Sequence, residues 1–416
     1  MIRPRVLLWL AGVWTLSVLG GEARWWKGNL HTHSLWSDGD DYPESVAAWY
    51  RDHGYNFLAL SDHNRMQQGD HWIDLKPTHG GGVALERNRQ RFGTNWLQFR
   101  DHKGTNQVRL KTLSEFRPLV EQPGRFLLIP SEEITGGHLS LPVHINATNL
   151  REPIAPQGGT NVLDVIQKVV GAVLDQRRRT QQPMFSHINH PNFGWGITAE
   201  DLVPVEGERF FEVYNGHPTV HNAGDSLHAG TDQVWDIVLA WRLGRLGLPP
   251  VFGLAVDDSH NYEKEGPGES NSGRGWVMVR AESLTANALI AAMEVGDFYA
   301  STGITLRDVR RTPGELHIEI EPEAGVSYRT RFFGTRRAFN DTRHPVTNAK
   351  GEPVRATQRY HGDVGELLAE TTGPYATYRL RGDELYVRAR IDSNRPVDRP
   401  VTKGETATAW TQPTWP

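Results

Sequence analysis

Histidines and carboxylates in this chain follow short apolar segments at spacings that suit a metal site. The first group is His31-Thr32-His33, which is followed by the turn Ser37-Asp38-Gly39. Because side chains two residues apart on a strand share a face, His31 and His33 are expected to point the same way. Two imidazoles and the Asp38 carboxylate make up half of a metal-binding shell.

The other half of such a shell follows apolar segments further along the chain. The groups are Ser61-Asp62-His63, Glu132-Glu133, His144, Asn189-His190-Pro191 and Asp258-Ser259-His260. The nine candidate metal ligands are His31, His33, Asp38, His63, Glu133, His144, His190, Asp258 and His260. A tetrahedral metal takes only about four ligands, so the sequence predicts two or three divalent transition-metal ions. Imidazole and carboxylate together suit Zn, Mn and Fe.

Two of these ligands have a competitor close by in the sequence. His138 follows two glycines in an expected loop, whereas His144 lies inside an apolar strand, which favours His144. Asp257 precedes Asp258, and the Asp-x-His spacing favours Asp258. A third histidine, His187, precedes the His190-Pro191 pair and is interpreted as a structural residue.

Short apolar segments alternate with helical patterns through the first three hundred residues. The expected strands are 25–31, 57–60, 126–130, 143–147, 184–188, 210–214, 251–256 and 276–279, and the expected helices are 43–50, 162–174, 232–246 and 286–294. The cations Arg177-Arg178-Arg179 are expected to cap the second helix. This alternation predicts an α/β fold, a parallel β/α barrel with its site at the carboxyl ends of the strands.

Two parts of the chain do not follow this pattern. Residues 64–124 are too long for a βα connection and predict an insertion, either a functional lid or a solvated cover. Its histidines His71, His79 and His102 are expected at the surface. From about residue 304 apolar and polar residues alternate, as in 316–321, which is typical of half-exposed antiparallel strands. We therefore expect a barrel over 24–303 and a small β-rich C-terminal domain over 304–416.

The N-terminus and the composition restrict the setting of the protein. Arg3 and Arg5 precede a short apolar run, and Gly21-Glu22-Ala23 offers small residues for cleavage, which predicts a signal peptide over 1–23. An uncleaved membrane anchor is the alternative. We expect a periplasmic or secreted protein with no stable membrane anchor after cleavage. A net charge of −4 argues against nucleic acid as a partner, and the absence of cysteine excludes thiolate ligands and disulfides.

The ordered set of motifs resembles the PHP family, the polymerase and histidinol phosphatase metallohydrolases. The resemblance covers residues 25–303 and implies a distorted seven-stranded, TIM-like (β/α)7 barrel. Ser131-Glu132-Glu133 matches the family's Gly-x-Glu at Glu133 and not at the adjacent Glu132, with Ser in place of Gly. The stretches 256–262 and 296–303 resemble the exported branch of the family that is related to carbamate hydrolases.

The resemblance also implies how the ligands are shared among the ions. One ion would be held by His31, His33, Glu133 and Asp258, a second by Asp38, His63 and His260, and a third by Glu133, His144 and His190. Glu133 would then bridge two of the ions. The residues expected to act in catalysis are Asp38, His63, Glu133 and His260.

Such a centre predicts metal-dependent hydrolysis of a small-molecule ester, with a metal-bridging hydroxide as the nucleophile. A phosphoester is the first expectation, and a carbamate, carboxylic ester or amide is the alternative. Five polar residues near strand ends could bind the substrate or protonate its leaving group: Asn189, Glu212, Asn215, His217 and Arg274. A remote alternative is an exported module that binds a metal or a carbohydrate without catalysis.

Overall fold

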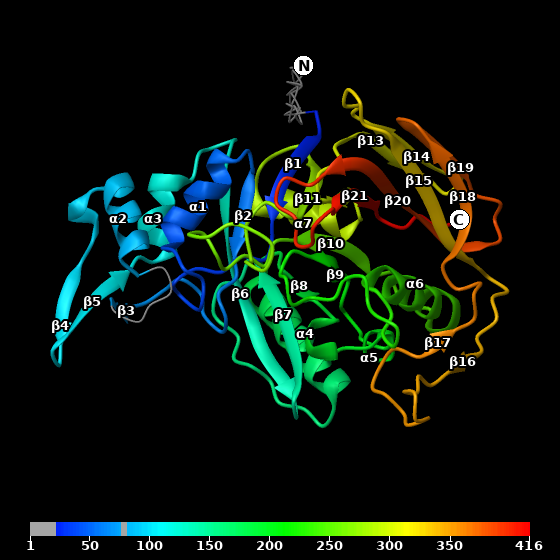
Figure 1. Cartoon of the computed structure of the whole chain (residues 1–416), viewed down its shortest axis with the longest axis horizontal. Helices are drawn as coiled ribbons and strands as arrows, with labels where there is room; N and C mark the ends of the chain where they lie inside the picture. Colours follow the sequence, from blue (N-terminus) through cyan, green and yellow to red (C-terminus); the bar gives the residue numbers. More distant parts are fainter. Residues whose placement is uncertain (1–21, 76–80) are drawn as a thin grey trace, which may run out of the picture.

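The computed structural model describes residues 22–75 and 81–416, and it is a mixed α/β protein built on one large sheet (Figure 1). The sheet has thirteen strands. Its first seven, in spatial order, are β10 (Phe252–Val256), β9 (Phe210–Asn215), β8 (Phe185–Ile188), β7 (Leu141–Thr148), β6 (Leu127–His138), β2 (Phe57–Leu60) and β1 (Arg24–Asn29). The remaining six are β11 (Trp276–Ala281), β12 (Phe298–Ser301), β21 (Thr406–Thr411), β20 (Glu384–Pro396), β15 (Tyr328–Arg336) and β18 (Glu366–Thr372).

The expected all-parallel barrel is wrong in one respect and is not established in another. β7 runs antiparallel to both β6 and β8. Only two residues, Leu139 and Ser140, connect β6 to β7, and so short a connection permits only an antiparallel hairpin. Beyond the ends of β1 and β10, Thr32 and Ser259 form an isolated parallel bridge. In the described chain this bridge, and no continuous ladder, joins the two ends of the seven-strand series.

The helices of the sheet region lie where the sequence predicts them, although most of them end at a different residue than expected. They are α1 (Pro43–Asp52), α4 (Val162–Thr180), α6 (Thr231–Trp241) and α7 (Ala286–Glu294), with the short α5 (Ala199–Leu202) between them. α4 buries Val165, Ile166 and Val169 against the core and continues past 174. Its three arginines lie in the last turn, where cations suit a helix C-terminus, and Arg177 pairs with Glu294 across the fold.

The insertion forms a small folded unit that contacts loops beside the large sheet. Its sheet contains β3 (His71–Asp74), β5 (Thr105–Leu110) and β4 (Phe99–His102), and its helices are α2 (Gly81–Phe92) and α3 (Leu113–Val120). Arg87 of α2 lies 3.0 Å from Asp41 and donates to the carbonyl oxygen of Tyr262. His102 is exposed as expected, whereas His71 is half-buried because its ring stacks on Trp36. His79 lies outside the described residues.

The C-terminal region is β-rich, as expected, and it continues the large sheet. β13 (Leu306–Arg311), β14 (Glu315–Ile320) and β19 (Tyr375–Arg379) form a second antiparallel sheet, and β16 (Arg343–His344) pairs with β17 (Arg359–Tyr360). β21 pairs with β12, which extends the first sheet into this region. Near the end of the chain, the Gln412 side chain bonds both the N–H and the C=O of Gly253 in β10, at 2.9 and 2.8 Å.

Residues 1–21 lie outside the described part, and the predicted signal peptide falls almost wholly within them. Within 22–75 and 81–416, no helix combines the length and the apolar character needed to cross a bilayer.

Candidate metal centre

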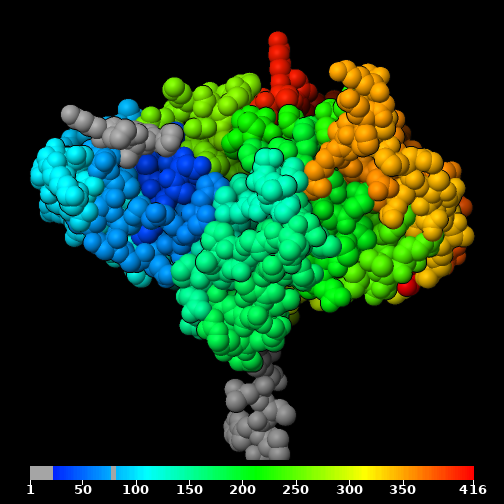
Figure 2. Space-filling view, turned by 90° about the horizontal axis from the view of Figure 1, so that it is seen from below, coloured from blue at the N-terminus to red at the C-terminus, as the bar shows by residue number. Residues whose placement is uncertain are grey.

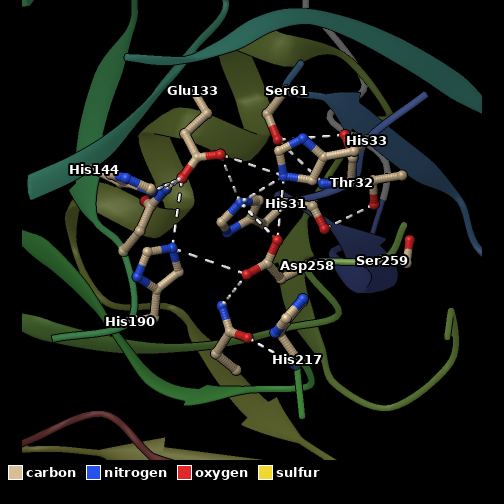
Figure 3. A network of polar contacts seen from close by, with 12 residues as sticks. His31, Thr32, His33, Ser61, Glu133, His144, His190, His217, Asp258 and Ser259 are labelled. Carbon is tan, nitrogen blue, oxygen red and sulfur yellow. Dashed lines mark hydrogen bonds and ion pairs between the residues drawn. The ribbon is translucent and has the colours of Figure 1, made fainter. Parts of the chain in front are cut away.

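All nine predicted ligands meet at one end of the seven-strand series. Figure 3 shows six of them: His31, His33, Glu133, His144, His190 and Asp258. Most of them follow the carboxyl end of a strand, as the sequence predicts. Glu133 and His144 instead lie inside β6 and β7, where the hairpin pairs Thr135 with His144 and Glu133 with Asn146. On the face shown in Figure 2, the dark-blue start of the described chain reaches the surface between the light-blue insertion and the teal β6–β7 hairpin.

Glu133 lies at the centre of the cluster and is fully buried. Five imidazole nitrogens lie within 3.5 Å of its carboxylate: His63 Nδ1 at 2.8 Å, His144 Nδ1 at 3.0 Å, His33 Nε2 at 3.3 Å, His31 Nε2 at 3.4 Å and His190 Nε2 at 3.5 Å. Its Oε2 accepts no hydrogen bond from the described residues. A buried anionic oxygen without a donor is costly, and a cation at this point would remove the cost.

The separations between these atoms fit ligands that share an ion. His31 Nε2 and His33 Nε2 are 3.1 Å apart, and Asp258 Oδ1 lies 3.2 and 3.1 Å from them. Ligands bonded at about 2.1 Å to one tetrahedral ion are roughly 3.4 Å apart. The donor set of imidazole and carboxylate also fits a divalent transition metal.

The atoms that could hold an ion fall into overlapping groups among the described residues. Four of these groups contain predicted ligands only: His31, His33 and Asp258; His33, Asp38, His63 and His260; His31, Glu133 and His190; and His63, Glu133 and His144. His144 and His190 thus fall into separate groups around Glu133, whereas the resemblance implied one. Asp38 is the most open of the nine, with 47% of its side chain exposed.

The structure places the competing residues away from the cluster. Glu132 points to the other side of β6, where it accepts a hydrogen bond from the Ile154 N–H. His138 lies at the end of β6, 3.2 Å from the carbonyl oxygen of Gly159. Asp257 is buried and accepts hydrogen bonds from the Tyr50 hydroxyl and from three successive backbone N–H groups, residues 273–275.

Glu212 holds members of the cluster in place, whereas its position near a strand end predicts a group that could bind the substrate or protonate its leaving group. Its Oε1 lies 2.6 Å from His31 Nδ1 and 3.2 Å from His187 Nε2, and its Oε2 accepts from the His190 N–H and from Asn215 Nδ2. A carboxylate bonded to Nδ1 directs the lone pair of His31 Nε2 toward the ion site. Glu212 is therefore a positioning residue and not a substrate contact. His187 also lies in a group that could hold an ion, with His31 and Glu212, and its interpretation as a structural residue stays a prediction.

Three other proposed substrate contacts are also engaged inside the protein. Asn189 donates to Glu133 Oε1 at 2.8 Å, and Asn215 donates to Asp258 Oδ2 at 3.0 Å. Arg274 is buried and donates to backbone carbonyl oxygens, including that of Gly216 at 2.8 Å. Only long-range packing decides these contacts, so sequence position could not reveal them.

Asp62 shapes the loop that carries Asp38. Its carboxylate accepts hydrogen bonds from the Ser34 N–H and from the hydroxyls of Ser34 and Ser37, at 2.8 to 2.9 Å. Burial raises the pKa of Asp62 to about 6. Gly39 closes the same turn, where a side chain would come within 2.7 Å of the His33 backbone.

The charges of the cluster move the pKa values of its members in opposite directions. Burial lowers the pKa of His63, but Glu133 and Asp38 outweigh it and raise this pKa to about 11. For His33, burial and the neighbouring His260 and His63 lower the pKa to about 3. Burial favours protonation of Glu133, yet the imidazoles around it hold its pKa well below the usual range. Without an ion, protons shared among the imidazoles balance the carboxylates, and a divalent cation would displace them.

Comparisons with known proteins give one weak structural likeness to report. No protein-family model matches the chain, and no curated protein matches it. The chain is similar to a solved two-domain protein from Bacteroides vulgatus ATCC 8482, described as containing a predicted PHP-like metal-dependent phosphoesterase. The two share 15% identity over 94% of this chain and 95% of that chain, with a TM-score of 0.41.

Proposed function

We propose that this protein is a metal-dependent hydrolase of the PHP type that acts on phosphoesters, with the seven strands from β10 to β1 forming a distorted barrel. Glu133 carries the proposal: one fully buried carboxylate has five imidazole nitrogens within 3.5 Å. A cluster of this kind has more ligand atoms than one ion needs, which supports two or three divalent ions.

The protein's own residues would hold and orient the ions and the substrate. Bound divalent ions supply an activated water and polarise the ester oxygen. Glu212 fixes the direction of His31, Asn189 fixes Glu133, and Asp62 fixes the loop of Asp38. Asp38 is half-exposed, so it lies on the side of the cluster that a substrate can approach.

The net charge of the metal-loaded centre depends on the number of bound ions, and this charge favours one class of substrate over another. The cluster contains the carboxylates of Asp38, Glu133, Asp258 and Glu212. Three divalent ions would exceed these four negative charges by two, which favours an anionic phosphoester, whereas two ions would leave the centre neutral. Our preference for phosphoesters therefore goes with three ions.

A carbamate or carboxylic ester is the second candidate, favoured by the side chains around the centre. The half-buried ring of Phe193 lies 5.8 Å from the ring of His144 and 5.1 Å from that of His190, so it offers an apolar wall. The insertion gives little support to an anionic substrate, because Arg109 of β5 pairs with Glu115 of α3, and Arg117 of α3 pairs with Glu121 just past that helix.

The test is turnover after removal and return of metal. The protein is stripped with a chelator, reloaded with Mn, Zn or Fe, and assayed on p-nitrophenyl phosphate, its diester, naphthyl carbamates and carboxylic esters. We expect metal-dependent phosphoester turnover in the wild type and in Glu132→Gln, and its loss in Glu133→Gln. Carbonyl turnover with inert phosphoesters would select the second candidate. Ligand binding without turnover of any ester would instead support the binding module.

We also infer export, because basic residues, a short apolar run and small residues near Ala23 follow one another at the N-terminus. The mass of the exported protein tests this inference. A mass that includes Met1 would contradict cleavage near Ala23.

A further inference from the structure

We propose that His217 donates a hydrogen bond from Nε2 to an oxygen of the substrate, which makes it a catalytic residue that is not a metal ligand. The proposal rests on the hydrolase function proposed above. His217 follows the carboxyl end of β9, the end of the sheet at which the cluster lies, and Figure 3 shows it beside Asp258. Its ring centroid is 5.3 Å from that of His260.

Of the five polar residues expected near the substrate, His217 is the one that has a side-chain nitrogen, Nε2, without a hydrogen-bond partner among the described residues. Asn189, Glu212, Asn215 and Arg274 use their side chains to hold Glu133, His31, Asp258 and backbone carbonyl oxygens. His217 belongs to none of the ligand groups found in the described chain. Its Nε2 also has no hydrogen-bond partner among those residues, and its side chain is half-buried.

Thr219 determines which ring nitrogen of His217 carries the proton. The backbone N–H of Thr219 donates to His217 Nδ1 at 3.2 Å, and the Thr219 hydroxyl lies 2.8 Å from the same atom. A backbone N–H can only donate, so Nδ1 must be an acceptor. The neutral imidazole therefore has its hydrogen on Nε2, which leaves a donor available to a ligand.

The backbone around His217 is held in place, as an orienting group requires. The His217 N–H donates to Asn215 Oδ1 at 2.8 Å, and the other end of that amide donates to Asp258. Gly216 lies against the next strand connection, where an added Cβ would come 2.8 Å from the carbonyl oxygen of Asp257. His217 is thus fixed relative to the strand end that supplies Asp258.

A fixed neutral N–H donor suits the non-bridging oxygen on which negative charge develops when an ester is attacked. It stabilises that charge without transferring a proton, so no bond of His217 forms or breaks. Removal of one such donor costs roughly 100-fold or more in kcat. The contact would serve a phosphoryl or a carbonyl oxygen equally.

The test compares three variants, each loaded with the same metal as the wild type and assayed on its best ester. We expect kcat to fall by roughly 100-fold in His217→Ala, with metal content unchanged and KM altered much less. His217→Gln should recover a large part of kcat, because its amide nitrogen can replace Nε2 as the donor. His221→Ala is the matched control: His221 is an exposed histidine of the same loop, and its variant should keep the wild-type rate.

A second measurement is independent of turnover. In zinc-loaded protein labelled with 15N-histidine, the signals that His217→Ala removes should show the proton on Nε2. The proposal is overturned by a His217→Ala rate within about twofold of the wild type, by loss of metal in that variant, or by a proton on Nδ1. A wild type that binds metal and hydrolyses no ester would instead defeat the proposed function, whatever the tautomer.

Discussion

Replacing Glu212 with Gln should weaken metal binding although Glu212 is not one of the nine predicted ligands. Its Oε1 faces His31 Nδ1 and His187 Nε2, and its Oε2 accepts from the His190 N–H and Asn215 Nδ2, at 2.6 to 3.2 Å. The amide NH₂ of Gln would meet two of these donors. Loss of a carboxylate behind a ligating histidine typically costs 10- to 100-fold in affinity, about 1.4–2.7 kcal/mol.

A buried clash between donors adds roughly 1–3 kcal/mol of lost folding stability. We therefore expect Glu212→Gln to bind metal at least about tenfold more weakly and to unfold at lower denaturant concentration.

The assay is competition for metal with a coloured chelator, run beside denaturant unfolding of the chelated protein. Glu208→Gln is the matched control, because Glu208 is an equally buried carboxyl near the start of β9 that contacts none of the nine ligands. Its Oε1 accepts from two backbone N–H groups, which a Gln oxygen can also do, and its Oε2 contacts only the Ser186 hydroxyl. Equal metal affinity of Glu212→Gln and wild type would refute the positioning role of Glu212.

Three further outcomes follow from the same contacts. Metal affinity should rise with pH, because His63, whose pKa is about 11 without an ion, must lose a proton to bind one. Addition of metal to weakly buffered protein should therefore release at least about one proton per chain, and the absence of proton release would count against the site. Asp258→Asn should lose metal, whereas Asp257→Asn should keep metal and lose folding stability, because Asp257 accepts four hydrogen bonds from Tyr50 and the 273–275 backbone. Elemental analysis distinguishes the two variants, and equal metal loss would contradict the choice of Asp258 as the ligand. Burial raises the pKa of Glu132 to about 7, so its ionisation opposes folding increasingly as pH rises from 4.5. Glu132→Gln should therefore gain roughly 3 kcal/mol of stability at pH 8 and almost nothing at pH 4, and equal gains at both pH values would contradict this explanation.

The sequence predicts the candidate site better than the fold around it. His31 and His33, or Asp258 and His260, are two residues apart, and their convergence follows from the local geometry of one extended segment. The sequence does not predict the antiparallel β7, because the turn residues Leu139 and Ser140 are not typical of a two-residue hairpin and the alternation of apolar segments and helices favours parallel strands. The role of Glu212 depends on a contact with a residue 181 positions away, which no local pattern encodes.

The hydrogen bonds of Gln412 affect the stage of folding at which the metal site can form. Its side chain bonds both backbone groups of Gly253 in β10, the strand that ends just before Asp257 and Asp258, and β21 beside it pairs with β12. A residue 159 positions further along the chain therefore holds a strand that leads to a predicted ligand. In a chain exported unfolded with its N-terminus first, as the proposed signal peptide would direct, these contacts form only after Gln412 has crossed the membrane. The ion would then be selected from the metals of the outer compartment and not from those of the cytoplasm.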